Sequence, residues 1–551
     1  MRKISLEQLS WNLILLICLI YLWTVLKYSV NMPLWDDYDA VLRFLNTYIE
    51  SNESLVKIKL IFFQHNEHRI VFNRIIELLQ FKLMGEINFL YLIIIGNIGW
   101  FLTIAFLWRY AKKREIKIVQ FLPVVLIMLS FVHYELMTWA MASLQQYYQI
   151  LFSLFAIYFL VNNRLIFSFL FMTVSIFTSG GGIVLIPIFL LYFLTQRDVK
   201  NFFITLIVSI ILLLIYFIIL HYSKPKFHPS ILKTLFNPLL VVHYALTFIG
   251  NIGKTKLVSL IVGISMLTLF TIIGKKVYNQ EPFLFWSTLF IIATALVTAL
   301  ARAGFGIKQS LSSKYSVYSV LLLSLIYLSY LITFKNKKIY LLGLVVGIVS
   351  FSFWFIYGTP WLEIRANALK KEILYPNAED AENILKKSAQ LKVFTSWQGI
   401  KLPSSLLNLP KIEGNNVYCI AIAKQIRVCN GSVRKYYSPE RSELKISIDK
   451  TKKKLRLEGW TVDSLNGKQA CGVVTQIDGK KQFFTLLPRR DVARSLNNQN
   501  YLWSGIVGDI DISDLKPGEY ILEIRTIDNT CSGYYETLKV PVLITDITQK
   551  R

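Results

Sequence analysis

Long runs of apolar residues constrain the fold of this chain more than any other feature. Hydrophobic residues make up 54% of the 551 residues and charged residues only 17%, a composition that excludes an ordinary soluble protein. About eleven runs come near the roughly 20 apolar residues that a helix needs to cross a bilayer. We therefore expect a polytopic α-helical membrane protein. The expected transmembrane helices lie near residues 11–30, 88–108, 118–133, 146–161, 165–178, 182–196, 201–220, 256–274, 282–301, 316–334 and 339–357.

Basic residues fall largely in the short segments between these runs. The net charge is +26, and every second connecting segment is basic, as at 109–117, 275–276 and 335–338. Such segments usually face the cytoplasm, so the charge indicates topology, and no nucleic acid partner is expected. With the N-terminus inside, an odd number of helices brings residues 358–551 to the outer face. The first run is expected to remain as an anchor in the bilayer.

Three regions follow from this topology. Residues 1–357 form the transmembrane domain, with a long outer loop at 31–87 whose apolar spacing predicts helices along the membrane surface. Residues 358–440 form a mixed, partly helical connector. Residues 441–551 alternate apolar and polar positions between turn dipeptides such as Asp478-Gly479. This pattern predicts an antiparallel β-sandwich in a soluble C-terminal domain on the outer face.

Four of the five cysteines lie in the C-terminal part of the chain. An oxidising outer compartment would allow them to form two disulfides. Proximity in sequence favours Cys419 with Cys429 and Cys471 with Cys531, although spacing alone leaves the other pairings open.

An acidic cluster, Trp35-Asp36-Asp37-Tyr38-Asp39, directly follows the first apolar run. Carboxylates at a membrane boundary cost free energy unless they are solvated or paired, so they indicate a functional site. We interpret Asp37 as a general base, with Asp36 a nearly equal candidate, and Trp35 and Asp39 as substrate-binding residues. The alternative is that the aspartates only solvate and cap the surface helix.

A second polar motif, His65-Asn66-Glu67-His68-Arg69, lies in the same outer loop. We interpret His65, Glu67 and His68 as substrate-binding residues. A metal site would need both histidines on one helix face, and the HExxH signature is missing. We therefore assign no metal ligands, and Mg²⁺ or Mn²⁺ on carboxylates remains a candidate cofactor.

Three further motifs are expected on the same face. Arg302-Ala303-Gly304-Phe305-Gly306 and Ser312-Ser313-Lys314-Tyr315 place two cations and Tyr315 around a glycine-containing turn; a plain hairpin with interfacial anchors is the alternative. His133 and Glu135 near Trp139 suit sugar hydroxyls, and 178–182 is either an anion-binding nest or a tight turn. Carboxylates, histidines and cations on one face suit group transfer from a lipid-phosphate donor.

These residues resemble the GT-C superfamily of polyprenyl-phosphate-sugar-dependent glycosyltransferases over about residues 1–357. Trp35-Asp36-Asp37, Glu67-His68-Arg69 and the motifs at 302–306 and 312–315 resemble, more narrowly, bacterial members that modify O-antigen, teichoic acid or other surface glycans. The resemblance implies inverting transfer of a single sugar from undecaprenyl-phosphate-sugar to a glycan hydroxyl, at the outer face of the bacterial cytoplasmic membrane.

The same resemblance implies roles for individual residues. Asp36 or Asp37 would be the base, and Arg69, Arg302 and Lys314 would hold the donor phosphate, although Lys314 stands where an arginine is expected. In the C-terminal region, Gly459-Trp460 and Pro517-Gly518 look like parts of a β module that binds the acceptor or acts as a structural lid.

Other functions share some of these features. A flippase or transporter of lipid-linked sugar would also use charges, but midway along its helices and in inverted repeats. A glycan polymerase that joins whole repeat units is not excluded by the sequence. A non-catalytic adhesin would leave the outer-loop carboxylates and cations without a purpose.

Overall fold

The computed structural model of the chain divides into two compact units, Met1–Ile400 and Lys401–Arg551. In the first unit the structure describes residues 5–225, 229–335, 339–371 and 378–396. In the second it describes residues 426–430, 433–437, 446–449, 454–462, 468–484, 486–489, 492–493, 498–529 and 533–545.

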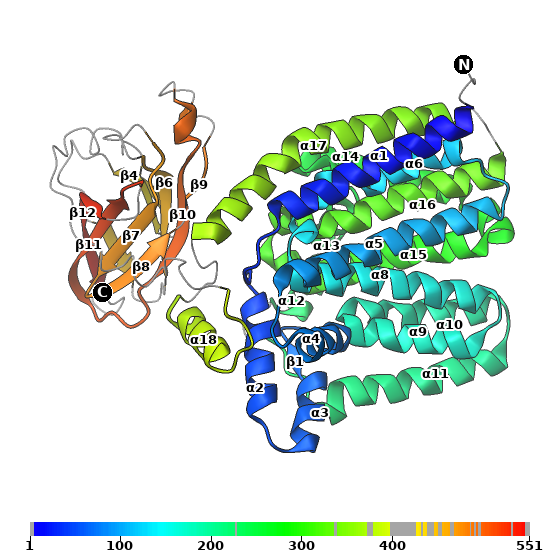
Figure 1. Cartoon of the computed structure of the whole chain (residues 1–551), viewed down its shortest axis with the longest axis horizontal. Coiled ribbons are helices and arrows are strands. Elements are labelled where there is room, and N and C mark those ends of the chain that lie inside the picture. The colour runs from blue at the N-terminus through cyan, green and yellow to red at the C-terminus, as the bar shows by residue number, and fades with distance from the viewer. Residues whose placement is uncertain are drawn as a thin grey trace. The chain divides into compact units, whose positions relative to one another are not determined.

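Long apolar helices dominate the first unit and run side by side (Figure 1). Within the described residues, nine helical segments are long and apolar enough to cross a membrane. A multi-pass membrane protein is therefore supported. These segments are α1 (Leu6–Tyr28), α5 (Phe89–Lys112), Ile118–Met137 with α6 (Ile118–Met128), η2 (Phe131–His133) and α7 (Tyr134–Met137), α8 (Ala140–Val161), α11 (Val199–Leu213) with η4 (Leu214–Ile219), α14 (Lys256–Gln280), α15 (Pro282–Arg302) with η6 (Ala303–Phe305), η8 (Ser313–Tyr315) with α16 (Ser316–Phe334), and α17 (Ile339–Lys371).

The predicted count of about eleven spans is not confirmed. The runs expected at 165–178 and 182–196 form α9 (Leu165–Thr178) and α10 (Leu185–Thr195), which have 14 and 11 residues. At 1.5 Å per residue they are about 21 and 17 Å long, short of a hydrocarbon core of about 30 Å. The short helix η3 (Gly180–Val184) separates them, because three consecutive glycines break the regular pattern. α13 (Pro238–Ile249) is a further short apolar helix.

The last long helix passes the point where we expected the span to end. α17 continues through Pro360 to Lys371. Beyond the proline, the Trp361 ring stacks on Tyr134 with centroids 6.1 Å apart, and the Arg365 guanidinium donates to the Tyr134 carbonyl at 2.8 Å. These contacts hold the extension against α7, so tertiary packing outweighs the helix-breaking tendency of proline.

The outer loop contains helices at the two stretches where apolar spacing predicts them, near 41–48 and 70–79, and also a helix at 54–62 and a hairpin that the spacing does not predict. The helices are η1 (Tyr38–Arg43), α2 (Phe44–Glu50), α3 (Ser54–Phe62) and α4 (Val71–Met84). Between α3 and α4, β1 (Gln64–His65) pairs with β2 (His68–Arg69), and His65 lies opposite His68. The two histidines therefore do not share a helix face, and the helical metal arrangement considered from the sequence is wrong.

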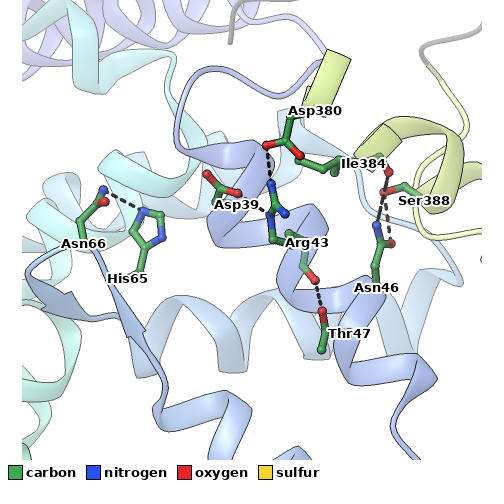
Figure 2. Close-up of polar contacts among 9 residues, drawn as sticks. All are labelled: Asp39, Arg43, Asn46, Thr47, His65, Asn66, Asp380, Ile384 and Ser388. Atoms are coloured by element: carbon green, nitrogen blue, oxygen red, sulfur yellow. Dashed lines mark hydrogen bonds and ion pairs between the residues drawn. The ribbon is translucent and has the colours of Figure 1, made fainter. Parts of the chain in front are cut away.

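A segment after the last long helix packs on this loop. α18 (Ala378–Gln390) lies beside η1 and α2, as Figure 2 shows. Arg43 bridges Asp39 and Asp380 with nitrogen–oxygen distances of 2.6 Å to each. The Asn46 amide donates to the Ser388 hydroxyl at 2.9 Å. Residues 378–396 therefore belong to the same unit as the helices.

Two five-stranded sheets form the second unit within its described residues. Their orders are β4-β3-β6-β10-β9 and β5-β12-β11-β7-β8. Strand pairs are antiparallel, as predicted, except that β5 pairs with β12 in parallel. The strands are β3 (Ile426–Asn430), β4 (Val433–Tyr437), β5 (Ile446–Asp449), β6 (Lys454–Trp460), β7 (Gly472–Ile477), β8 (Lys480–Phe484), β9 (Leu487–Pro488), β10 (Trp503–Asp511), β11 (Gly518–Ile527) and β12 (Tyr534–Thr545).

One apolar cluster includes side chains from both sheets, among them Leu457 of β6 and Leu522 of β11. The hairpin between β7 and β8 turns at Asp478 and Gly479, whose φ angles are 48° and 74°, as such a dipeptide predicts. Cys471 is disulfide-bonded. Cys419 and Cys531 of the predicted pairings lie outside the described residues.

Candidate functional site

Asp37, the first candidate base, is buried and bonded to backbone. Its two carboxylate oxygens accept hydrogen bonds from the Leu34 amide at 3.0 Å and the Met141 amide at 2.9 Å. Met141 lies in the first turn of α8, where amide groups lack helical partners. Burial raises the pKa of Asp37 to about 7, partly offset by these two amides. Asp37 therefore attaches the outer loop to the start of α8.

Asp36 is the more accessible carboxylate of the pair. It is partly exposed, and its side chain makes no hydrogen bond or ion pair with other residues that the structure describes. Its negative charge acts on both His65 and His68, which places it beside the hairpin. Of the two aspartates, Asp36 has the carboxylate that a substrate hydroxyl can reach.

Asp39 has a structural partner. Its carboxylate pairs with Arg43 one turn along the helix, and Arg43 also holds Asp380 of α18 (Figure 2). This arrangement links the acidic cluster to α18. The structure brings Asp39 close to His65, whose pKa the Asp39 charge raises slightly against the stronger effect of burial.

The two histidines of the hairpin are neutral in their surroundings. Burial lowers the pKa of both His65 and His68 to about 4. The Nδ1 atom of His68 accepts a hydrogen bond from the Gly180 amide at 3.2 Å, so the proton is on Nε2. That nitrogen lies 3.3 Å from Glu67 Oε1. Gly180 belongs to the glycine motif at 178–182, which therefore meets this hairpin.

Glu67 joins the hairpin to the second cationic motif. Its carboxylate forms an ion pair with the Arg302 guanidinium at the end of α15, and both side chains are 17% exposed. The motifs at 65–69 and 302–306, more than 200 residues apart in sequence, are therefore in contact. The sequence analysis expected both motifs on the same face.

Arg69, which the resemblance implies as a phosphate ligand, is bonded to backbone carbonyl groups. Its guanidinium donates to the carbonyl oxygens of Phe62, Tyr216 and Leu220 at 2.7 to 3.1 Å, and the side chain is buried. All of these acceptors are backbone atoms at helix ends. Through these bonds Arg69 ties α3 to the end of η4, and a phosphate at Arg69 would have to replace backbone acceptors.

Of the three cations predicted to hold the donor phosphate, Lys314 is the one whose charged group makes no hydrogen bond or ion pair with other described residues. Its ammonium lies 5.9 Å from the Trp139 ring centroid and 5.5 Å from that of Tyr315, and it has no carboxylate within ion-pair distance among the described side chains. Trp35 packs edge-on against Trp139 with centroids 5.0 Å apart and is 38% exposed. The partly exposed Trp35 indole is thus joined to the Lys314 ammonium through the buried Trp139 ring, an arrangement that suits a ligand with a sugar ring and an anionic group.

The Glu135 carboxylate accepts hydrogen bonds from the turn that contains Ser312 and Lys314. Its Oε2 atom accepts from the Ser312 hydroxyl at 3.0 Å and from the Lys314 amide at 2.9 Å. His133 is fully buried, with its Nε2 atom 3.5 Å from the Tyr21 hydroxyl. Glu135 therefore fixes the turn that carries Lys314.

The candidate divalent metal has no ligand set here. Among the side chains that the structure describes, no group of three or more His, Cys, Asp or Glu residues could hold a metal ion. The carboxylates of Asp37, Asp39 and Glu67 are directed to backbone amides or to cations. These residues do not fit a divalent cation, and no chemical step is assigned to one.

The sequence interpretation missed two cations near this region. Lys254 donates to the Leu311 carbonyl and the Ser316 hydroxyl, and Arg365 donates to the Tyr134 carbonyl. No sequence signal distinguished Lys254, because the same expected outer loop also contains Lys224, Lys226 and Lys233. Arg365 lay beyond the predicted end of the last span, so nothing in the pattern connected it with Tyr134.

Comparisons of the chain with protein-family models, curated proteins and solved structures give no match. The class of the protein is therefore argued from its own geometry.

Proposed function

We propose that this chain is an inverting glycosyltransferase that moves one sugar from undecaprenyl-phosphate-sugar to a hydroxyl of a surface glycan at the outer face of the bacterial cytoplasmic membrane. One observation carries the proposal. The partly exposed carboxylate of Asp36 and the unneutralised ammonium of Lys314 both lie within electrostatic range of the neutral imidazole of His68, in a chain with nine candidate membrane-spanning helices among its described residues.

Asp36 is the proposed general base. It takes the proton of the acceptor hydroxyl as that oxygen attacks the anomeric carbon of the donor. The bond from this carbon to the phosphate oxygen breaks, and its electron pair leaves with the polyprenyl phosphate. A single displacement inverts the anomeric configuration. Asp37 supports this step indirectly, since it fixes the adjacent backbone to α8.

Lys314 and Arg302 are the proposed partners of the donor phosphate. Charge that develops on the leaving phosphate is stabilised by nearby cations in a site with little water. Arg302 is held by Glu67, so a phosphate that binds Arg302 competes with a carboxylate of the chain itself. Lys314 needs no such exchange with the described carboxylates, and we assign it the first contact.

Trp35 and Trp139 are the proposed sugar contacts. Sugar rings present apolar faces that pack on indoles, while their hydroxyls need polar partners. The edge-on pair of indoles adjoins the Lys314 ammonium, which would place the sugar next to the phosphate. The β module, which we propose to be a sandwich, would bind the acceptor glycan.

The test is transfer of labelled sugar by the purified full chain from a panel of synthetic polyprenyl-phosphate-sugars to isolated cell-surface glycan. Transfer from at least one donor is expected, with loss of transfer in Lys314→Met. No transfer from any donor, together with donor crossing the bilayer of liposomes that contain the protein, would instead identify a flippase.

A further inference from the structure

The turn at residues 311–316 carries Lys314 but has little regular structure of its own. It joins the end of η7 (Ile307–Leu311) to η8 and to the first residue of α16. Within the turn, the Tyr315 amide donates to the Ser312 carbonyl at 3.1 Å. Short helices of this kind have poor hydrogen-bond geometry, so the position of Lys314 depends on side chains from other elements.

One side of this turn is held by Glu135, which bonds the Ser312 hydroxyl and the Lys314 amide. Further hydrogen bonds to the turn come from the segment between α13 and α14. The side-chain amide of Asn251 donates to the Ser312 carbonyl at 2.8 Å. The Lys254 ammonium donates to the Leu311 carbonyl at 3.2 Å and to the Ser316 hydroxyl at 2.6 Å.

Lys254 is therefore bonded to both ends of the turn. Its backbone has a φ of 56°, a conformation that costs free energy for a residue with a side chain. This strained residue caps η5 (Asn251–Gly253), where its amide donates to the Asn251 carbonyl at 3.1 Å. The backbone hydrogen bond to Asn251 fixes the main chain of Lys254 next to the turn.

We infer that Lys254 is a positioning residue for Lys314. The ammonium of Lys254 holds the two ends of the 311–316 turn, so that the Lys314 side chain lies next to Trp139. The part of this inference that concerns the donor phosphate rests on the proposed function. The positioning role goes beyond the proposed function, because the charged group that it requires, the Lys254 ammonium, does not touch substrate.

Charge matters to this arrangement because hydrogen bonds from an ammonium are roughly twice as strong as neutral ones. Burial lowers the pKa of Lys254 to about 7, and Glu135 offsets part of this effect. The other charged and titratable groups around it are His133, Lys314 on the turn, and Arg365, which faces Glu135. As pH rises above about 7, the ammonium loses its proton and its hold on the turn weakens.

The test is hydrogen–deuterium exchange of the 312–316 amides in the full chain, corrected for the intrinsic effect of pH. At pH 6.5 we expect Lys254→Met to exchange about tenfold faster than wild type, the effect of one lost charge-assisted bond. Lys254→Arg keeps its charge, so it should stay protected at pH 9, where wild type opens. Lys256→Met, two residues away and exposed, is the matched control and should match wild type.

Binding of a short-chain polyprenyl phosphate, measured on the same variants, separates this inference from the proposed function. Weaker binding in Lys254→Met and Lys314→Met, with Lys254→Arg near wild type at pH 9, supports both. Faster exchange in Lys254→Met without any phosphate binding by wild type supports the positioning role and contradicts the proposed function. Equal exchange in wild type and Lys254→Met overturns the inference, whatever binds.

Discussion

Adjacent aspartates differ in exposure and in hydrogen bonding because their surroundings differ. Asp36 and Asp37 look equivalent in sequence, yet Asp37 is 1% exposed and bonded to two amides, whereas Asp36 is partly exposed. Sequence located the pair but could not rank its members, because the rank depends on Met141, which is 104 residues away. The same holds for Arg69, whose backbone acceptors near Tyr216 are set by tertiary packing.

The raised pKa of Asp37 predicts a pH effect on stability. Its folded-state pKa of about 7 lies above its ordinary value of about 4. The stability that its protonated form contributes is present below about pH 4 and is lost as pH rises through 7. We expect the unfolding temperature of the detergent-solubilised wild type to fall from pH 5 to pH 8 relative to Asp37→Asn. A difference between the two proteins that does not change with pH would contradict this assignment.

The Glu67–Arg302 ion pair predicts a gain in binding. Removing the charge of Glu67 leaves Arg302 free to bind a phosphate, so Glu67→Gln should bind a polyprenyl phosphate severalfold more tightly, an effect of about 1 kcal/mol. Glu53→Gln removes the same charge from an exposed site in the same loop and serves as control. Weaker binding by Glu67→Gln in an isothermal titration would show that Glu67 supports the site instead of competing for it.

At the scale of elements, apolar periodicity predicted helices well and failed where side chains from distant segments decide the backbone. The hairpin at 64–69 forms where His68 bonds the Gly180 amide and Arg69 bonds the end of η4. α17 continues past Pro360 because α7 packs against it. Neither partner is visible in the local sequence.

Close packing of α5 on α8 predicts the effect of a single methyl group. A Cβ at Gly96 would lie 2.1 Å from the Ser143 hydroxyl and 3.0 Å from the Leu144 amide nitrogen, whereas at Gly274 the nearest atom is 3.8 Å away. Small residues allow such approach between membrane helices. Gly96→Ala should lower the unfolding temperature, at a cost of about 1–3 kcal/mol. Gly274→Ala, the control, should be neutral or slightly stabilising; equal effects would contradict this packing.

At the scale of the molecule, the sequence predicted a multi-pass membrane protein with an appended β region, and the described residues contain nine candidate membrane-spanning helices and a C-terminal region of strands. The predicted number of spans is not confirmed, because the runs at 165–178 and 182–196 have the composition of a span but form helices of only 14 and 11 residues. The sequence motifs do meet in space through Glu67–Arg302, His68–Gly180 and Glu135–Lys314. The expectation that these motifs lie near one another is therefore confirmed for these three pairs.

The proposed outer location of the site predicts a labelling pattern. In a Cys18→Ser background, Glu53→Cys in the outer loop should react with a membrane-impermeant maleimide in intact spheroplasts beyond the level of the Cys18→Ser protein itself, which measures any reaction of the C-terminal cysteines. A cysteine at position 113, an exposed position in a basic segment, should react only after permeabilisation, since basic loops stay inside. The reverse pattern would place the site on the cytoplasmic side and contradict the proposed donor.

The central claim is that Asp36 activates the acceptor, and its most direct test is the turnover of Asp36→Asn beside Asp37→Asn with a donor that wild type uses. We predict that Asp36→Asn lowers kcat by about 10²–10⁴-fold, the usual contribution of a general base, while binding of polyprenyl phosphate is kept. Asp37→Asn should mainly reduce stability and lose less activity per folded molecule. Full activity in folded Asp36→Asn, with loss confined to Asp37→Asn, would contradict the claim.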